Sequence, residues 1–165
     1  MSVRILPPGI EHDPPPGSVL VVDVDGVLSD ASGRQHLLDG ESRQWEAFFE
    51  ASVDDSPVSE GIGLIRELAT DDEHQTIVLL TARPARLANI TMAWMDRYDI
   101  DWDLLVMRVD DDHRSSPDVK REAVVDLRAT GHEPALAVDD DPRNAEMYRS
   151  EGIPVVYIHS GYYDL

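Results

Sequence analysis

Short apolar runs alternate along this chain with longer segments of helical periodicity. The four clearest runs cover residues 18–22, 76–80, 135–138 and 153–158, and a weaker one covers 104–107. The helix-like segments cover residues 58–69, 84–98, 117–128 and 142–150. Continuous apolar runs of this length are typical of strands that are buried on both faces. The alternation therefore predicts an α/β fold of three layers, Rossmann-like, with a mostly parallel sheet and helices on both faces.

Residues 1–17 differ in composition from the rest of the chain. They contain five prolines and show no apolar periodicity, so we expect a proline-rich N-terminal extension there. Residues 18–165 are expected to form one domain, because a chain of 165 residues is long enough to bury a single core.

The connection between the first predicted strand and the first long helix is too long for a simple loop. It spans residues 29–57, and residues 43–51 within it have the pattern of a short helix. We interpret the segment as a small cap or flap over a site. Its aromatic side chains are Trp45, Phe48 and Phe49. Core packing under the flap is the favoured interpretation of these rings, and stacking on a nucleobase is the alternative.

Composition narrows the functions open to the chain. The 33 acidic and 14 basic residues give a net charge of −19, which disfavours an extended interface with duplex DNA. This acidity suits a compositional bias or a salt-adapted source. The absence of cysteine excludes thiolate nucleophiles and cysteine zinc sites. Because no apolar run approaches the roughly 20 residues of a membrane helix, and no signal-peptide core is present, we expect a cytoplasmic protein without membrane contact.

Side chains that suit phosphate chemistry follow the predicted strands. They are Asp23 and Asp25 after the first run, Thr81, Ala82 and Arg83 after the second, and Asp139, Asp140 and Asp141 after the run that ends at residue 138. Lys120, the only lysine in the chain, lies near the start of a helix-like segment. Ligands of open α/β sheets bind beyond the carboxyl ends of the strands, so we expect these residues to meet at one edge.

Clustered carboxylates repel one another unless a proton or a cation compensates them. A group of aspartates without histidine or cysteine suits Mg²⁺. An ionised aspartate can also attack phosphorus and form an aspartyl-phosphate. Arg83, Lys120 and the metal would then offset the charge on the phosphoryl oxygens. The pattern thus indicates phosphoryl transfer. The acidic run at Asp110, Asp111 and Asp112 has no such context and is expected to be solvated.

The motifs resemble those of a known superfamily. D-V-D-G-V-L-S at 23–29, Thr81 after a second strand, Lys120 before a later strand and D-D at 139–140 resemble the four motifs of the haloacid-dehalogenase (HAD) phosphotransferases. Further segments resemble the phosphatase domain of polynucleotide kinase/phosphatase proteins: Arg34, W-E-A-F-F, D-D-S-P, T-A-R-P, M-R, V-K-R-E and D-D-D-P-R-N-A-E-M-Y-R-S-E-G-I. The kinase motif G-x-x-x-x-G-K-[ST] does not occur, so the kinase half is not expected here.

The resemblance implies a role for each matching residue. Asp23 matches the nucleophile and Asp25 the general acid/base. Thr81, Ala82 and Arg83 match the segment that binds the phosphoryl group, and Arg34 matches an arginine near the substrate. Lys120 matches the lysine that steadies the aspartyl-phosphate. The Mg²⁺ ligands implied are Asp23, Asp25 through its backbone carbonyl, Asp139 and Asp140.

Two positions depart from the family pattern. Asp141 stands where the family often has arginine, with Arg143 two residues later. Ser116 stands where the family has an acidic partner before the lysine, and Asp118 is displaced from that place. Both departures concern the preferred substrate more than the general chemistry.

The sequence therefore predicts a Mg²⁺-dependent phosphomonoester hydrolase that works through an aspartyl-phosphate, with nucleic-acid 3′ ends or nucleotides as the favoured substrates. A phosphatase of small metabolites is the alternative within enzymes. A receiver-like module, which binds a metal or is itself phosphorylated, is the alternative outside them. Asp25 favours an enzyme, because a receiver-like module needs no acid/base two residues after its phosphorylated aspartate.

Overall fold

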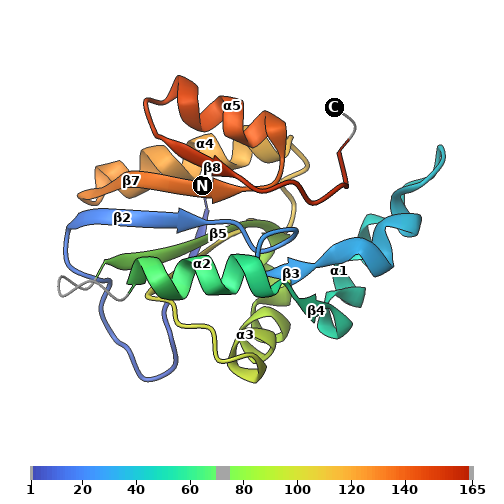
Figure 1. Ribbon diagram of the computed structural model, residues 1–165, viewed down its shortest axis with the longest axis horizontal. Coiled ribbons are helices and arrows are strands. Elements are labelled where there is room, and N and C mark those ends of the chain that lie inside the picture. Colours follow the sequence, from blue (N-terminus) through green and yellow to red (C-terminus); the bar gives the residue numbers. More distant parts are fainter. Residues whose placement is uncertain (1, 70–74, 164–165) are drawn as a thin grey trace.

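The computed structural model describes residues 2–69 and 75–163. Within them, six strands form one sheet in the order β1-β6-β5-β2-β7-β8 (Figure 1). The strands are β1 (Val3–Ile5), β2 (Gly17–Val22), β5 (Thr76–Pro84), β6 (Leu104–Arg108), β7 (His132–Asp139) and β8 (Val155–Tyr157). All neighbouring strands are parallel except β1, which pairs antiparallel with β6. The expected α/β architecture is confirmed.

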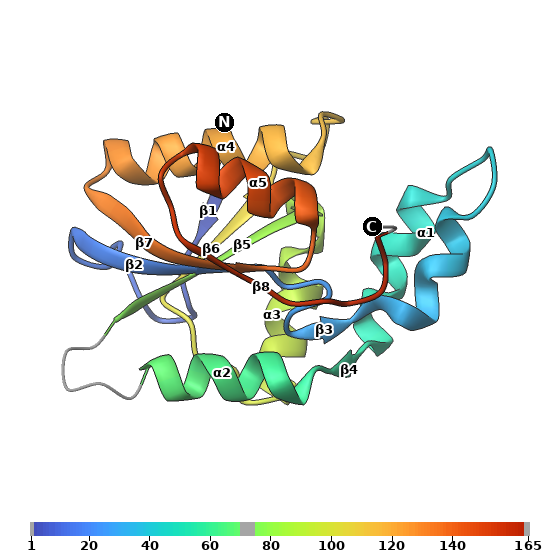
Figure 2. The ribbon, with the colours of Figure 1, turned by 45° about the horizontal axis from the view of Figure 1, so that its top comes forward.

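Helices cover both faces of the sheet (Figure 2). The long helices are α2 (Ser59–Ala69), α3 (Ala88–Arg97), α4 (Ser116–Ala129) and α5 (Pro142–Ser150). Alternate residues of β2 point to opposite faces, as the period of a strand requires. Leu20 and Val22 pack with residues of α2 and α3. Val19 and Val21 pack with residues of α4 and α5. Two apolar cores therefore fix the three layers.

The segment between β2 and α2 forms a compact flap at the carboxyl end of the sheet (Figures 1 and 2). A two-stranded ladder of β3 (Ser29–Asp30) and β4 (Ser56–Pro57) closes its base. Between these strands lie η1 (Ala31–Leu38), α1 (Trp45–Glu50) and η2 (Ala51–Asp54), where η marks a 3₁₀ helix. The expected short helix is present in α1, although it is shorter than residues 43–51.

Two elements differ from the expectations. The expected helix over residues 84–98 begins later, because β5 continues to Pro84 and η3 (Ala85–Leu87) precedes α3. A shift in the pairing of β5 with β6 between Thr81 and Pro84 allows this longer strand. The second difference is β1, a strand that the sequence did not predict.

The proline-rich start of the chain lies partly against the sheet. Beyond the pairing of β1, the His132 ring bonds to the Pro14 carbonyl at 3.0 Å, and the Gly17 amide donates to the Gly131 carbonyl at 3.0 Å. The division into an extension and a domain stays a prediction. In the described part of the chain no helix has the length and apolar character needed to span a membrane.

Candidate active site

Three buried aspartates meet at the carboxyl edge of the sheet. Asp23 follows β2, Asp139 ends β7 and Asp140 follows it, and one carboxylate oxygen of each lies within 4.8 Å of the others. Gly26 permits this approach, because its backbone has a φ of +81° and a Cβ added there would lie 1.9 Å from an oxygen of Asp140. The predicted convergence of Asp23, Asp139 and Asp140 is therefore present.

Asp140 has the surroundings of a cation ligand. Both of its carboxylate oxygens are buried and have no hydrogen-bond partner among the described residues. Burial raises the pKa of Asp140 to about 7, although the nearby Ser160 hydroxyl offsets part of the rise. Burial also raises the pKa of Asp23. A group of hard oxygen donors that resists ionisation without a cation fits Mg²⁺.

Asp139, by contrast, is held by several protein groups. Its carboxylate accepts hydrogen bonds from Lys120 Nζ at 2.7 Å, from Asn144 Nδ2 at 3.0 Å and from the Asp141 amide at 3.0 Å. These bonds orient Asp139 relative to Asp23 and Asp140. Asn144 was not identified from the sequence, and only its place in the D-D-D-P-R-N segment pointed to it.

Lys120 links two of the acidic side chains. It is fully buried on α4, and its Nζ lies 3.0 Å from Asp23 Oδ1 and 2.7 Å from Asp139 Oδ2. Burial alone would lower the pKa of Lys120, but Asp139 and Asp23 outweigh burial and raise it. The ammonium group therefore stays charged beside Asp23.

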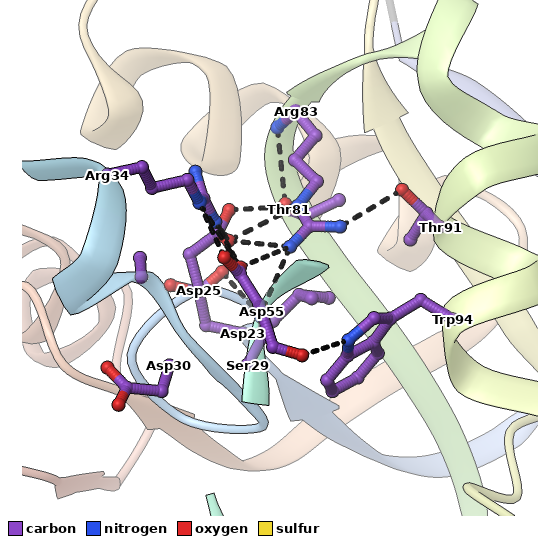
Figure 3. A network of polar contacts seen from close by, with 12 residues as sticks. Asp23, Asp25, Ser29, Asp30, Arg34, Asp55, Thr81, Arg83, Thr91 and Trp94 are labelled. Carbon is purple, nitrogen blue, oxygen red and sulfur yellow. Dashed lines mark hydrogen bonds and ion pairs between the residues drawn. The ribbon is translucent and has the colours of Figure 1, made fainter. Parts of the chain in front are cut away.

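A second cluster holds Asp25, two residues beyond Asp23 (Figure 3). The Asp25 carboxylate accepts from Arg83 Nη2 at 2.7 Å and from Arg34 Nη2. Although burial opposes them, Arg83 and Arg34 hold the pKa of Asp25 well below its usual range. Among the described residues, the carboxylate of Asp25 does not join the group formed by Asp23, Asp139 and Asp140. This agrees with the expectation that Asp25 would contact the metal through its backbone carbonyl and not through its carboxylate.

Asp55 completes this second cluster and was missed by the sequence analysis. Its buried carboxylate accepts from Ser29 Oγ at 2.5 Å and from Arg34 Nε at 3.0 Å, and lies 3.6 Å from Arg83 Nη2. The Trp94 indole donates to the Asp55 carbonyl at 2.8 Å (Figure 3). The only sequence signal for Asp55 was its place in the D-D-S-P segment of the family resemblance.

The segment at the end of β5 brings a hydroxyl and a cation to the same edge. Thr81 is fully buried, and its Oγ1 accepts from the Arg83 amide at 3.2 Å. Ala82 lies between them. The Arg83 guanidinium is fixed by Thr91 Oγ1 at 3.2 Å and Ser29 Oγ at 3.1 Å, in addition to the carboxylates. The structure thus gathers the expected phosphate-binding residues beside β2, the neighbour of β5.

The two departures from the family pattern have local structural partners. Asp141 caps α5 by accepting from the Arg143 amide at 2.9 Å, and it also binds the Arg143 side chain at 2.7 Å. Ser116 accepts from Asn144 Nδ2 at 3.2 Å. The Arg143 guanidinium therefore pairs with the acid that stands in the family's arginine position.

The acidic run after β6 has other partners. Asp110 accepts from the Arg86 amide at 2.7 Å, and Asp112 pairs with Arg114 at 2.6 Å. Neither belongs to a group of metal-ligating side chains among residues 2–69 and 75–163. A metal-binding role for the run has no structural support there.

The aromatic residues of the flap divide into two kinds. Phe48 is buried, and its ring lies 4.2 Å from the Arg34 guanidinium carbon. This agrees with the core packing favoured by the sequence. Trp45 is 46% exposed, so the expectation of core packing was wrong for this ring.

Comparison with known sequences shows the family of the chain, and comparison with solved structures shows its fold. The sequence model of the family described as the polynucleotide kinase PNKP phosphatase domain, of the HAD group, matches residues 17–163. No curated protein matches the chain. A chain of the Pnkp1/Rnl/Hen1 RNA repair complex shares the fold with a TM-score of 0.72 and 21% identity. That match covers 90% of this chain and 44% of the other.

Two further structures share the fold. A class C acid phosphatase from Bacillus anthracis has a TM-score of 0.64 and 13% identity, over 94% of this chain and 70% of that one. A HAD-family enzyme from Bacteroides thetaiotaomicron, in complex with magnesium and inorganic phosphate, has a TM-score of 0.50 and 12% identity, over 87% and 95%. The chain spans less than half the length of the RNA repair chains that it matches.

Proposed function

Because this chain belongs to the PNKP phosphatase domain family of the HAD superfamily, we propose that it is a Mg²⁺-dependent phosphomonoesterase that removes 3′-phosphates from nucleic-acid ends or nucleotides. One observation carries the proposal. Two aspartates, two residues apart, lie in opposite environments: Asp23 beside Lys120 and the acidic group, Asp25 between two arginines. Environments that differ in this way suit two carboxylates to different roles. Lys120 and a bound cation would keep Asp23 ionised for attack, whereas the carboxylate of Asp25 stays outside the acidic group.

Asp23 is the proposed nucleophile. Its carboxylate oxygen attacks phosphorus, the bond from phosphorus to the leaving oxygen breaks, and an aspartyl-phosphate forms. Asp23, Asp139 and Asp140 would hold the Mg²⁺, together with the Asp25 carbonyl. When bound, Mg²⁺ neutralises negative charge on the carboxylates and on the phosphoryl oxygens. Lys120, at 3.0 Å from Asp23, steadies the same charge from the side of α4.

Asp25 is the proposed general acid and base. It protonates the leaving oxygen in the first step and removes a proton from the attacking water in the second. The arginines that hold the pKa of Asp25 low are also the proposed phosphate ligands. A phosphate dianion that binds Arg34 and Arg83 would weaken their hold on Asp25, so that it can take up the proton that the first step needs.

The substrate class rests on the family and on the charge of the chain. The matching family is named for polynucleotide kinase, and one structural relative belongs to an RNA repair complex. A net charge of −19 opposes extended contact with a nucleic-acid backbone, so the chain is proposed to bind a strand end. The same charge favours a small phosphate ester as the second candidate substrate.

The test is phosphate release in the presence of Mg²⁺. The substrates are an oligonucleotide with a 3′-phosphate, the same oligonucleotide with a 5′-phosphate, and a panel of small esters. We expect preferential release from the 3′ end, dependence on Mg²⁺ and loss of activity in Asp23→Asn. Release from small esters alone would remove the nucleic-acid assignment, and release from none would remove the enzyme assignment.

A further inference from the structure

An exposed aromatic ring stands on the flap that also carries Arg34, one of the two proposed phosphate-binding arginines. Trp45, the first residue of α1, is 46% exposed, whereas Trp94 is 1% exposed. A tryptophan side chain can bury roughly 150–250 Å², so leaving nearly half of it in water forgoes a large apolar gain. The proposed chemistry at Asp23 and Asp25 does not use this ring.

The Trp45 ring is nonetheless held in place. It stacks on Phe49 with 5.9 Å between the centroids and an interplanar angle of 26°. It also meets the edge of Phe48 at 5.9 Å and 84°. Because both partners lie on the same short helix, the indole is supported by the flap before any ligand arrives. A pre-organised ring loses little freedom when it stacks on a partner.

Phe48 connects this ring to the site. The Phe48 ring lies 4.2 Å from the guanidinium carbon of Arg34, and the Phe48 carbonyl accepts from Arg34 Nη1 at 3.2 Å. Arg34 in turn binds Asp25. The Phe48 ring therefore lies between Trp45 and Arg34, the arginine that binds the proposed general acid. Figures 1 and 2 both place α1 on the carboxyl side of the sheet.

The negative charge of the flap determines whether its surface can contact the phosphates or the bases of a nucleic acid. The helix that carries Trp45 also carries Glu46 and Glu50, and the whole chain has a net charge of −19. These charges disfavour a phosphate backbone laid along α1. A nucleobase is uncharged and presents a flat π face. The Arg43 guanidinium carbon lies over the Trp45 ring, 6.0 Å from its centroid, and adds one cation there. Stacking is thus the contact that an acidic flap permits.

We propose that Trp45 stacks on the unpaired base of the nucleotide that carries the scissile phosphate. The inference rests on the proposed function and adds to it a preference for base-bearing, single-stranded ends. Trp45 would thereby select nucleotides over other phosphate esters of similar size, while Arg34 and Arg83 bind the phosphate that all such esters share.

The experiment compares two 3′-phosphorylated trinucleotides that differ only in the base of the last nucleotide, which is present in one and absent in the other. The measured quantity is the ratio of their kcat/KM values. We expect a ratio well above one for the wild type and a ratio lowered roughly 5- to 100-fold in Trp45→Ala. Trp45→Phe should retain most of the ratio, and Trp45→Leu, which keeps apolar bulk without a π face, should not.

Each other outcome overturns the inference. A wild-type ratio near one, or an unchanged ratio in Trp45→Ala, means that Trp45 does not stack on the base. The proposed 3′-phosphatase activity would not be affected by that result. A variant that lowers both kcat/KM values equally shows a structural role for Trp45. Hydrolysis of glycerol 2-phosphate without hydrolysis of either trinucleotide removes both the nucleic-acid substrate and the inference. Thermal unfolding of each variant confirms that the flap is folded.

Discussion

Arg34 binds the buried carboxylate of Asp55 through two nitrogens, Nε at 3.0 Å and Nη2 at 2.7 Å. The same guanidinium reaches Asp25, so Arg34 stands between one acid of the flap and one acid of the loop after β2. Asp55 also lies 3.6 Å from Arg83. The position of both proposed phosphate-binding arginines therefore depends on a residue 30 positions beyond Asp25 in the chain.

Asp55→Asn should reduce phosphatase activity without removing the acidic group around Asp23. The amide keeps the size of the side chain but loses one charge opposite two arginines. Among residues 2–69 and 75–163, Arg34 and Arg83 then pair with Asp25 alone as a carboxylate. We expect kcat/KM to fall about 100-fold, because misplaced phosphate ligands weaken transition-state binding. The measurement is steady-state kinetics with Mg²⁺ in excess.

Asp54→Asn is the matched control, because Asp54 is adjacent and exposed. It should retain activity close to that of the wild type. Mg²⁺ binding, followed by calorimetry, should be similar in both variants, since Asp55 lies outside the proposed metal group. Equal activities of Asp54→Asn and Asp55→Asn would show that Asp55 does not position the arginines.

Asp140→Asn should stabilise the protein when no divalent cation is present. The pKa of Asp140 is raised to about 7 in the folded state, from an ordinary value of 3.8. Between these pH values the unfolded chain loses a proton that the folded chain keeps, so the free energy of unfolding falls as pH rises and levels off above pH 7. The asparagine variant lacks this loss, which is up to about 4 kcal/mol.

Urea unfolding in EDTA at pH 5 and at pH 8 tests this sign. The stability gain of Asp140→Asn over the wild type should be larger at pH 8. Saturating Mg²⁺ should then raise the unfolding midpoint of the wild type and have a smaller effect on the variant. A variant that is less stable than the wild type at pH 8 in EDTA would refute the prediction.

Much of the fold follows from local sequence patterns. The apolar runs predicted β2, β5, β6, β7 and β8. The buried strands β5 and β6 show why, because a strand that is covered on both faces must be apolar throughout. The strand at Val3–Ile5 was not predictable in this way. Its three residues become a strand only because β6, about 100 residues later, offers a free edge, and propensity carries little information about such partners.

Some residues of the site could likewise be identified from local sequence patterns, and others could not. Asp23, Thr81 and Asp140 could be found because each follows an apolar run in the sequence, and parallel topology brings the ends of such runs together. Asp55 could not, because it reaches the arginines only after the flap folds back on β3, and one carboxylate among 33 acidic residues has no local signature. The exposure of Trp45 likewise depends on how the flap packs.

Lys120→Arg should be nearly as inactive as Lys120→Met. The ammonium group is fully buried between Asp23 and Asp139, and a guanidinium is larger, planar and unable to occupy the same point. We expect kcat/KM to fall by at least about 100-fold in both variants, since a charge opposite the phosphoryl group is displaced or lost. Arg121→Lys, at an exposed position on the same helix, should remain active.

The free energy of unfolding gives a second test of the role of Lys120. Lys120→Met leaves Asp23 and Asp139 without their buried cation and should cost about 3–5 kcal/mol in the absence of Mg²⁺. Added Mg²⁺ should recover part of this loss. An active Lys120→Arg enzyme would mean that any cation suffices at this position.

Tyr162→Phe should weaken the attachment of the C-terminal segment to the flap. The Tyr162 hydroxyl donates to Asp30 Oδ1 at 2.7 Å, and the same Asp30 oxygen accepts from the Ser32 amide at 2.9 Å to cap η1, the 3₁₀ helix that carries Arg34. Loss of one hydrogen bond to a charged group costs about 1.5–3 kcal/mol when the bond is well formed and less at an exposed site. We therefore expect a two- to tenfold fall in kcat/KM.

A double-mutant cycle with Asp30→Ala tests whether the bond itself transmits the effect. If it does, the double variant should lose no more activity than Asp30→Ala alone, because the second change removes a bond that is already broken. Tyr157→Phe, which removes an exposed hydroxyl from β8, should leave kcat/KM unchanged. Additive losses would place the effect of Tyr162 elsewhere, in the packing of its ring against the flap.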